Sequence, residues 1–136
     1  MADITFLLDG SSSAASAFGS LKDFISFILS RFRYFSRFGV IIGGDSAQYK
    51  IPHDSSQSLD SLKQMIGSLQ LQAGDRLNLD KSLQQALNEM QGSAMRNGVP
   101  KVFVLLTTSN QTPTGQELEK IKQIRALGTP QFVHCF

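Results

Sequence analysis

Cysteine and histidine are scarce in this chain of 136 residues, which holds one cysteine and two histidines. A single thiol, Cys135, cannot form an internal disulfide. The two histidines, His53 and His134, lie far apart in the sequence, and no zinc-ligand spacing occurs. A disulfide framework and a zinc site are therefore excluded.

The sequence also lacks a large net charge and long apolar runs. Thirteen basic against 11 acidic residues give a net charge of +2, which is too balanced to predict nucleic-acid binding. Arg31, Arg33 and Arg37 lie among aromatic residues, a pattern that can bind RNA. We interpret it instead as cations at the end of a helix, followed by aromatic residues that enter the core. No apolar run approaches the length of about 18 residues that a membrane span needs. We expect neither a nucleic-acid partner nor a membrane span.

Hydrophobic periodicity predicts strands that alternate with helices. The expected strands are residues 4–8, 38–42, 47–51, 101–106 and 131–136, of which 47–51 alternates like an exposed edge strand. The expected helices are residues 18–32, 59–69, 79–90 and 114–127. Ser16 is a candidate cap for the first helix, and Phe32 and Leu118 are expected to face the core. This order predicts an α/β, Rossmann-like doubly wound sheet that is mainly parallel, with one antiparallel edge strand and helices on both faces.

Asp9, Ser11 and Ser13 follow directly on the first apolar run. They place several hard oxygen atoms on one short loop, and such oxygens suit Mg²⁺ or Mn²⁺. Open α/β sheets bind ligands just past the carboxyl ends of their strands. The same residue types also form ordinary strand-to-helix turns. Residues 9–13 alone leave both interpretations open.

Four segments in order resemble von Willebrand factor type A domains, especially those of the collagen VI type. The segments are residues 3–11, 38–51, 69–83 and 98–107. The resemblance covers nearly the whole chain and implies one domain over residues 1–136. It implies a secreted, extracellular matrix or adhesion module that binds other proteins, collagen among them, and that is not an enzyme. The family usually continues with a further helix and strand, so we expect the C-terminal edge strand to offer a surface for self-association.

The family's metal-ion-dependent adhesion site has five protein positions on three loops. Asp9, Ser11 and Ser13 match the first loop. The expected threonine of the second loop falls at Leu77, and the expected aspartate of the third falls at Thr108. One carboxylate offsets the charge of Mg²⁺ poorly, and Mg²⁺ gives up its waters reluctantly. We therefore expect a degenerate site that binds Mg²⁺ or Mn²⁺ weakly or not at all, and no resident cofactor.

Without a metal, Asp9 needs other partners. The hydroxyls of Ser11, Ser13 and Thr108 are expected to donate hydrogen bonds to it and to hold the loops together.

Three further residues are candidates around this site. Asp75 and Asp80 lie near Leu77 and are substitute metal ligands, although loop aspartates more often form turns or cap helices. Asn110 begins the sequence Asn-Gln-Thr, an acceptor pattern for N-glycosylation that agrees with an extracellular setting.

Two alternative functions stay open. One keeps a metal at Asp9 and makes the chain a Mg²⁺-dependent adhesion domain that binds collagen or another matrix ligand. The other is a receiver-like or hydrolase-like enzyme that uses Asp9 as acceptor or nucleophile. Such an enzyme needs further acids and a lysine at neighbouring strand ends, whereas Lys101 begins its strand and so lies at the opposite end of the sheet.

Overall fold

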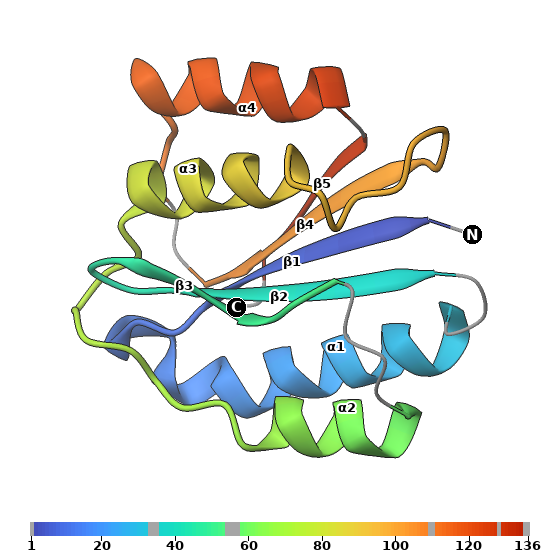
Figure 1. Cartoon of the computed structure of the whole chain (residues 1–136). Coiled ribbons are helices and arrows are strands. Elements are labelled where there is room, and N and C mark those ends of the chain that lie inside the picture. Colours follow the sequence, from blue (N-terminus) through green and yellow to red (C-terminus); the bar gives the residue numbers. More distant parts are fainter. Residues whose placement is uncertain (1, 33–35, 54–57, 109–110, 128, 135–136) are drawn as a thin grey trace.

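The computed structural model describes residues 2–32, 36–53, 58–108, 111–127 and 129–134, the last range by its backbone only (Figure 1). Its elements are β1 (Asp3–Asp9), the 3-10 helix η1 (Ser12–Ala17), α1 (Phe18–Phe32), β2 (Arg37–Gly43), β3 (Ala47–Ile51), α2 (Leu59–Gly67), α3 (Leu79–Met90), β4 (Lys101–Thr107), α4 (Gln116–Leu127) and β5 (Thr129–His134). In this described part, no helix is both long and apolar enough to cross a membrane. Cys135 lies outside the described residues.

The strand order in the sheet is β3-β2-β1-β4-β5, with β1 in the centre. β1 pairs in parallel with both β2 and β4, β5 runs parallel to β4, and β3 is antiparallel to β2. The chain leaves β1 through α1 toward β2 and later crosses to β4 on the other side of β1. This reversal puts the carboxyl end of β1 at the topological switch point, where open α/β sheets bind ligands. The predicted α/β class, with its mainly parallel sheet and antiparallel edge strand, is confirmed.

Helices cover both faces of the sheet: α1 and α2 lie on one side, α3 and α4 on the other (Figure 1). Alternate residues of a strand point to opposite faces, so β1 contributes Phe6 and Leu8 to the core under α1 and Leu7 to the core under α3. All three side chains are fully buried. Because burying a large apolar side chain stabilises the fold by about 1.5–3 kcal/mol, these two cores hold the three layers together.

Side-chain caps fix where α2 and α3 begin. Ser58 Oγ accepts a hydrogen bond from the Ser61 N–H at 3.2 Å, and Asn78 Oδ1 accepts one from the Lys81 N–H at 3.0 Å. Each cap satisfies one of the N–H groups that a helix leaves unpaired at its start. The cap at Asn78 also fixes the end of the loop that leads from α2 to α3.

Three sequence-based expectations about the helices are wrong. Phe32 and Leu118 are 54% and 48% exposed instead of facing the core. Phe32 is the last residue of α1, so no further turn covers its ring. Leu118 precedes the buried Ile121 and Ile124 at strict three-residue spacing, and each such step turns the helix by only about 300°, which rotates Leu118 off the core face. Ser16 lies inside η1, so it does not cap α1.

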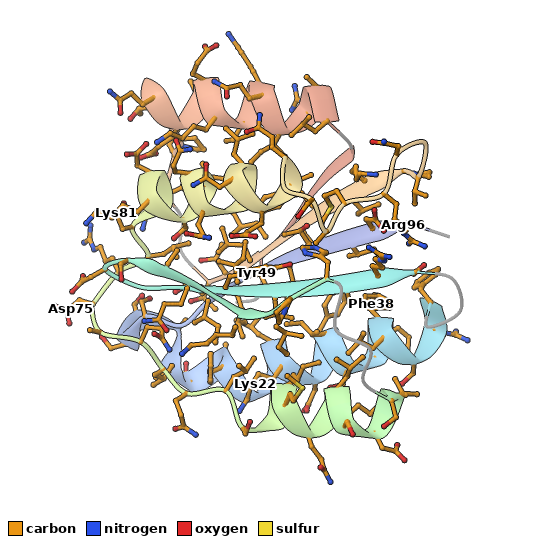
Figure 2. All side chains as sticks on the ribbon, in the orientation of Figure 1. Lys22, Phe38, Tyr49, Asp75, Lys81 and Arg96 are labelled. Carbon is orange, nitrogen blue, oxygen red and sulfur yellow. The ribbon has the colours of Figure 1, made fainter. Side chains whose placement is uncertain are left out.

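A buried carboxylate, Asp3, fastens the amino-terminal end of β1 to the loop before β4. Arg96 donates to Asp3 Oδ2 from its backbone N–H at 2.8 Å, and to Oδ1 from Nε at 2.8 Å and Nη2 at 2.6 Å. Lys101 Nζ lies 3.3 Å from Asp3 Oδ2 and also donates to the carbonyls of Arg96 and Val99. Burial raises the pKa of Asp3, but the hydrogen bonds and charge of Arg96, together with Lys101, outweigh it and hold this pKa below its ordinary value of 3.8. Figure 2 shows Arg96 at the end of the sheet opposite Asp75.

His53, just after β3, folds back over the sheet. Its buried ring places Nε2 2.8 Å from Thr5 Oγ1 of β1. The Tyr49 hydroxyl bonds His53 Nδ1 and accepts from the His53 N–H at 2.6 Å. Gly39 of β2 makes room for the ring, because a Cβ there would lie 2.1 Å from His53 Cε1. The imidazole therefore links β3 to β1 across β2.

The Gly39→Ala variant should be destabilised by about 2–3 kcal/mol, because the added methyl must displace the His53 ring and break its bond to Thr5. The matched control is the same substitution in a His53→Ala background, where no ring occupies the space. Urea denaturation of the four proteins gives the coupling between the two sites. An equal cost of Gly39→Ala in both backgrounds would show that the ring does not depend on this glycine.

Candidate functional site

Three loops meet at the carboxyl end of β1: residues 10–13, 43–46 and 72–78, which we call the lip (Figure 1). Hydrogen bonds between backbone groups join them. The bonds run from Gly10 N to Gly43 O (2.8 Å), Ser12 N to Gly74 O (2.9 Å), Ser13 N to Asp75 O (3.2 Å), Asp45 N to Ala73 O (2.8 Å), Gln72 N to Gly10 O (2.7 Å) and Asn78 N to Gly44 O (2.7 Å). The main chain thus fixes how the lip loops lie relative to one another.

Asp9 ends β1 beneath the lip, and its side chain is fully buried. Asp9 Oδ1 accepts from the Ser11 N–H at 3.0 Å and from Ser11 Oγ at 2.6 Å. Asp9 Oδ2 accepts from Thr107 Oγ1 of β4 at 2.6 Å. Ser13 Oγ lies 2.9 Å from Ser11 Oγ and extends this chain of hydroxyls to the exposed surface. Both oxygens of Asp9 are therefore satisfied by groups of its own chain.

The donor from β4 is Thr107, whereas the sequence pattern predicted Thr108. Leu8 of β1 pairs with Leu106 of β4, so Asp9 and Thr107 continue the register and point to the same face of the sheet. Thr108 is the next residue, half-buried just beyond the strand end. The predicted bond to Asp9 is confirmed for Ser11. Ser13 bonds Ser11 Oγ instead of Asp9, and the donor from β4 is Thr107 instead of Thr108. Register with β1 is the signal that identifies Thr107, and sequence alone does not supply it.

Leu77 lies in the lip, at the position where the family pattern expects threonine. Its side chain is 4% exposed and belongs to the core under α3. A Cβ on Gly43, the neighbour of Asp9 in β2, would lie 2.4 Å from Leu77 Cδ1 and 2.5 Å from Ser82 Oγ. The buried Ser82 hydroxyl has no hydrogen-bond partner among the described residues. An aliphatic side chain therefore occupies the space beside Asp9 on the β2 side.

Gln111 also contributes to the lip, and sequence reasoning missed it. Its Nε2 donates to the Leu77 carbonyl at 3.1 Å, which ties the β4–α4 connection to the loop before α3.

The two candidate substitute ligands, Asp75 and Asp80, have side-chain partners other than the Asp9 network. Asp75 is exposed, and its Oδ1 accepts from Ser12 Oγ at 3.3 Å on the outside of the lip. Asp80, in the first turn of α3, forms an ion pair with Lys120 of α4. Asn110, the glycosylation candidate, lies outside the described residues.

The donor set at the lip fits Mg²⁺ poorly. Mg²⁺ is usually held by one or two carboxylates in near-octahedral geometry, and Asp9 is the carboxylate that the lip buries. Both of its oxygens already accept hydrogen bonds. Within the described residues, no three histidine, cysteine or acidic side chains come together as metal ligands. What the arrangement supplies chemically is a rigid polar network that holds the ends of β1 and β4 together.

Asp9→Ala is expected to lower the free energy of unfolding by about 1–3 kcal/mol, because it removes the acceptor for two Ser11 donors and for Thr107. Ser13→Ala is the matched control. That exposed hydroxyl ends the chain of bonds, and its loss should change stability by less than about 0.5 kcal/mol. Thermal and chemical denaturation measure both values. Equal stability of Asp9→Ala and the parent protein would contradict a structural role for the network.

Comparison with known proteins agrees with this fold. A family model described as von Willebrand factor type A domain matches residues 3–134. Proximal thread matrix protein 1 from the mussel byssus is 19% identical with a TM-score of 0.83, covering 98% of this chain and 37% of that one. A second structure of that protein, described as having a zinc-occupied MIDAS (metal-ion-dependent adhesion site) motif, is 24% identical with a TM-score of 0.79, covering 98% of this chain and 35% of that one. BatB from Bacteroides thetaiotaomicron is 16% identical with a TM-score of 0.80, covering 98% of this chain and 66% of that one.

At these identities the solved structures show a shared fold. This chain spans just over a third of the mussel protein and about two thirds of BatB. The family model adds the assignment, because it matches nearly every residue from β1 to β5. The chain belongs to the von Willebrand factor type A domain family, whose members are adhesion and protein-interaction modules.

Proposed function

We propose that the chain is a non-catalytic, extracellular protein-interaction module of a matrix or adhesion protein, whose inherited metal-ion-dependent adhesion site is degenerate. It acts as one domain over residues 1–136. Family membership supports the interaction role. The name of the mussel relative, a byssal matrix protein with the same fold, supports the matrix setting.

One observation supports the degenerate site: both carboxylate oxygens of Asp9 already accept hydrogen bonds from groups of this chain. Asp9 accepts three hydrogen bonds from Ser11 and Thr107. The side chain of Leu77 is aliphatic, whereas the metal site needs an oxygen ligand at this position. A second carboxylate is missing at Thr108, so the charge of a divalent ion would be offset by Asp9 alone. Binding of a partner then depends on surface shape and polar contacts at the lip, without a metal bridge.

Titration calorimetry tests this proposal directly. Addition of Mg²⁺ or Mn²⁺ to the wild-type chain should give no binding heat at concentrations up to about 1 mM. Binding to immobilised matrix proteins, with collagen as the first probe, should be unaffected by EDTA. Tight Mg²⁺ binding that disappears in Asp9→Ala would overturn the degenerate site.

A second function is supported by the adjacent hydroxyls of Ser11 and Ser13, whose oxygens lie 2.9 Å apart beside Asp9. In this alternative the domain is a Mg²⁺-dependent adhesion module for collagen or another matrix ligand. Loss of matrix binding on addition of EDTA, and its recovery with excess Mg²⁺, would decide for it.

Self-association through β5 is a separate part of the proposal. β5 has β4 on one side and forms an edge of the sheet, and exposed edges favour pairing with a second chain. Size-exclusion chromatography with light scattering distinguishes a dimer from a monomer.

A further inference from the structure

An asparagine–glycine pair, Asn97-Gly98, lies on an exposed turn between α3 and β4, at the opposite end of the sheet from the lip. Both residues are exposed. Gly98 has a φ of +74°, and a Cβ built on it would meet nothing within 4 Å. The peptide nitrogen between the two residues is therefore approached by solvent and by the Asn97 side chain without steric hindrance.

The turn is fixed on both sides of this pair. Arg96 is bound to Asp3 by its backbone N–H and its guanidinium. Lys101 Nζ holds the carbonyls of Arg96 and Val99. Between these anchors, in the described structure, no hydrogen bond engages the Asn97 side chain or the Gly98 N–H. The pair can therefore change conformation locally while the rest of the loop stays in place.

We propose that Asn97 is a site of spontaneous covalent modification, in which its side-chain amide is lost and the residue becomes isoaspartate or aspartate. The Gly98 nitrogen gives up its proton to solvent and bonds to Asn97 Cγ. The bond from Cγ to the amide nitrogen breaks, and ammonia leaves with a proton taken from solvent, which closes a five-membered succinimide. Water then opens the ring at either carbonyl. Opening at one carbonyl gives aspartate, and opening at the other routes the main chain through the side chain as isoaspartate.

Two other asparagines, Asn78 and Asn88, lack the features that favour this reaction at Asn97. Asn78 caps α3 through its side-chain oxygen and is followed by Leu79, the first residue of the helix. Asn88 lies inside α3, where its Oδ1 accepts from Gln84 Nε2 at 2.8 Å. Both side chains are engaged, and both following residues carry a Cβ. They serve as internal references in the same molecule.

The reaction changes the chemistry around the ion pair of β1. It adds a negative charge at the residue that follows Arg96, whose guanidinium pairs with Asp3. Isoaspartate also inserts one extra backbone carbon between the two carbonyls that hold Lys101. The modified loop is therefore expected to open more readily than the original one.

The experiment is a time course of the full chain at 37 °C and pH 7.4, followed by peptide mass mapping. Each event replaces NH₃ by H₂O in the mass balance, a gain of about one dalton. Asn97 should gain it at least about tenfold faster than Asn78 and Asn88, with isoaspartate in excess over aspartate, as read by isoaspartyl methyltransferase labelling. Comparable rates at the three asparagines, or aspartate without isoaspartate, would overturn the proposal.

Two controls separate the folded turn from the sequence alone. Asn97→Gln keeps an amide but requires a larger ring, so the early mass gain should vanish while thermal unfolding stays unchanged. The same time course in denaturing urea gives the rate of the open chain. If the native protein reacts more than about tenfold slower than the unfolded one, the turn protects Asn97 and the proposal fails. The outcome does not depend on whether the lip binds metal.

Discussion

Replacing Leu77 by Thr together with Thr108 by Asp is expected to turn the lip into a Mg²⁺ site. The second carboxylate would share the charge of the ion with Asp9, and a threonine hydroxyl would replace the carbon beside Gly43. The new hydroxyl also offers a partner to Ser82 Oγ, which has none among the described residues. Calorimetry should show Mg²⁺ binding near or below about 1 mM, at least about tenfold tighter than in the wild-type chain.

Two further variants serve as controls for this test. Thr108→Asp alone should restore part of the affinity, because charge matters more to Mg²⁺ than one neutral oxygen. Asp9→Ala, added to the double variant, should abolish binding. Circular dichroism and thermal unfolding must first show that the double variant is folded, since Leu77 is a buried core residue. A folded double variant without Mg²⁺ binding would mean that the lip geometry, and not these two side chains, prevents coordination.

Asp3→Asn is expected to reduce the free energy of unfolding by about 3 kcal/mol, the low end for breaking a buried ion pair. The buried carboxylate is lost, and Arg96, whose side chain is only 26% exposed, is left beside Lys101 without its counter-charge. Asp80→Asn is the matched control. Asp80 is 42% exposed and pairs with Lys120 at the surface, so its loss should cost less than about 1 kcal/mol. Similar losses in the two variants would refute the structural importance of the buried pair.

The same ion pair predicts how stability depends on pH. The pKa of Asp3 is lower in the folded chain than its ordinary value of 3.8, so the unfolded chain binds the proton more tightly. The stabilisation is therefore fully present above that ordinary value and is lost as the pH falls from about 4 through the folded pKa. Urea denaturation at pH 3 to 7 should show this loss in the wild-type chain and a weaker dependence in Asp3→Asn.

Local pattern was sufficient to predict most of the fold. Continuous apolar runs identified the central strands, and three- and four-residue spacing identified the helices, because both features depend on neighbours in sequence. The errors at Phe32 and Leu118 arise where helical phase or a helix end decides exposure. The links between distant segments had no sequence signal: Asp3 and Arg96 are 93 positions apart, and Thr5 and His53 are 48 positions apart. Such pairs depend on strand register and on the space that Gly39 leaves.

The candidate site was predicted in its outline and corrected in its detail. Asp9 and Ser11 lie together as expected because they belong to one loop. The third partner depended on which residue of β4 lies level with Asp9, and the pairing of β1 with β4 selects Thr107. The burial of Leu77 in the core under α3 also required the folded packing. The sequence thus predicts which polar groups one loop carries, whereas the pairing of the strands determines which residues of other elements contact them.

The lip loops are held by bonds between backbone atoms, and this has a consequence for how the surface can vary. Each of these bonds uses a peptide N–H and a peptide carbonyl, so exchanging the side chain leaves the bond in place. Exposed positions such as Ser12, Asp45, Asp75 and Arg76 can therefore change identity without altering the path of the chain. Evolutionary drift, or selection from a display library, can therefore introduce many different side chains at these positions while the backbone of the lip stays the same.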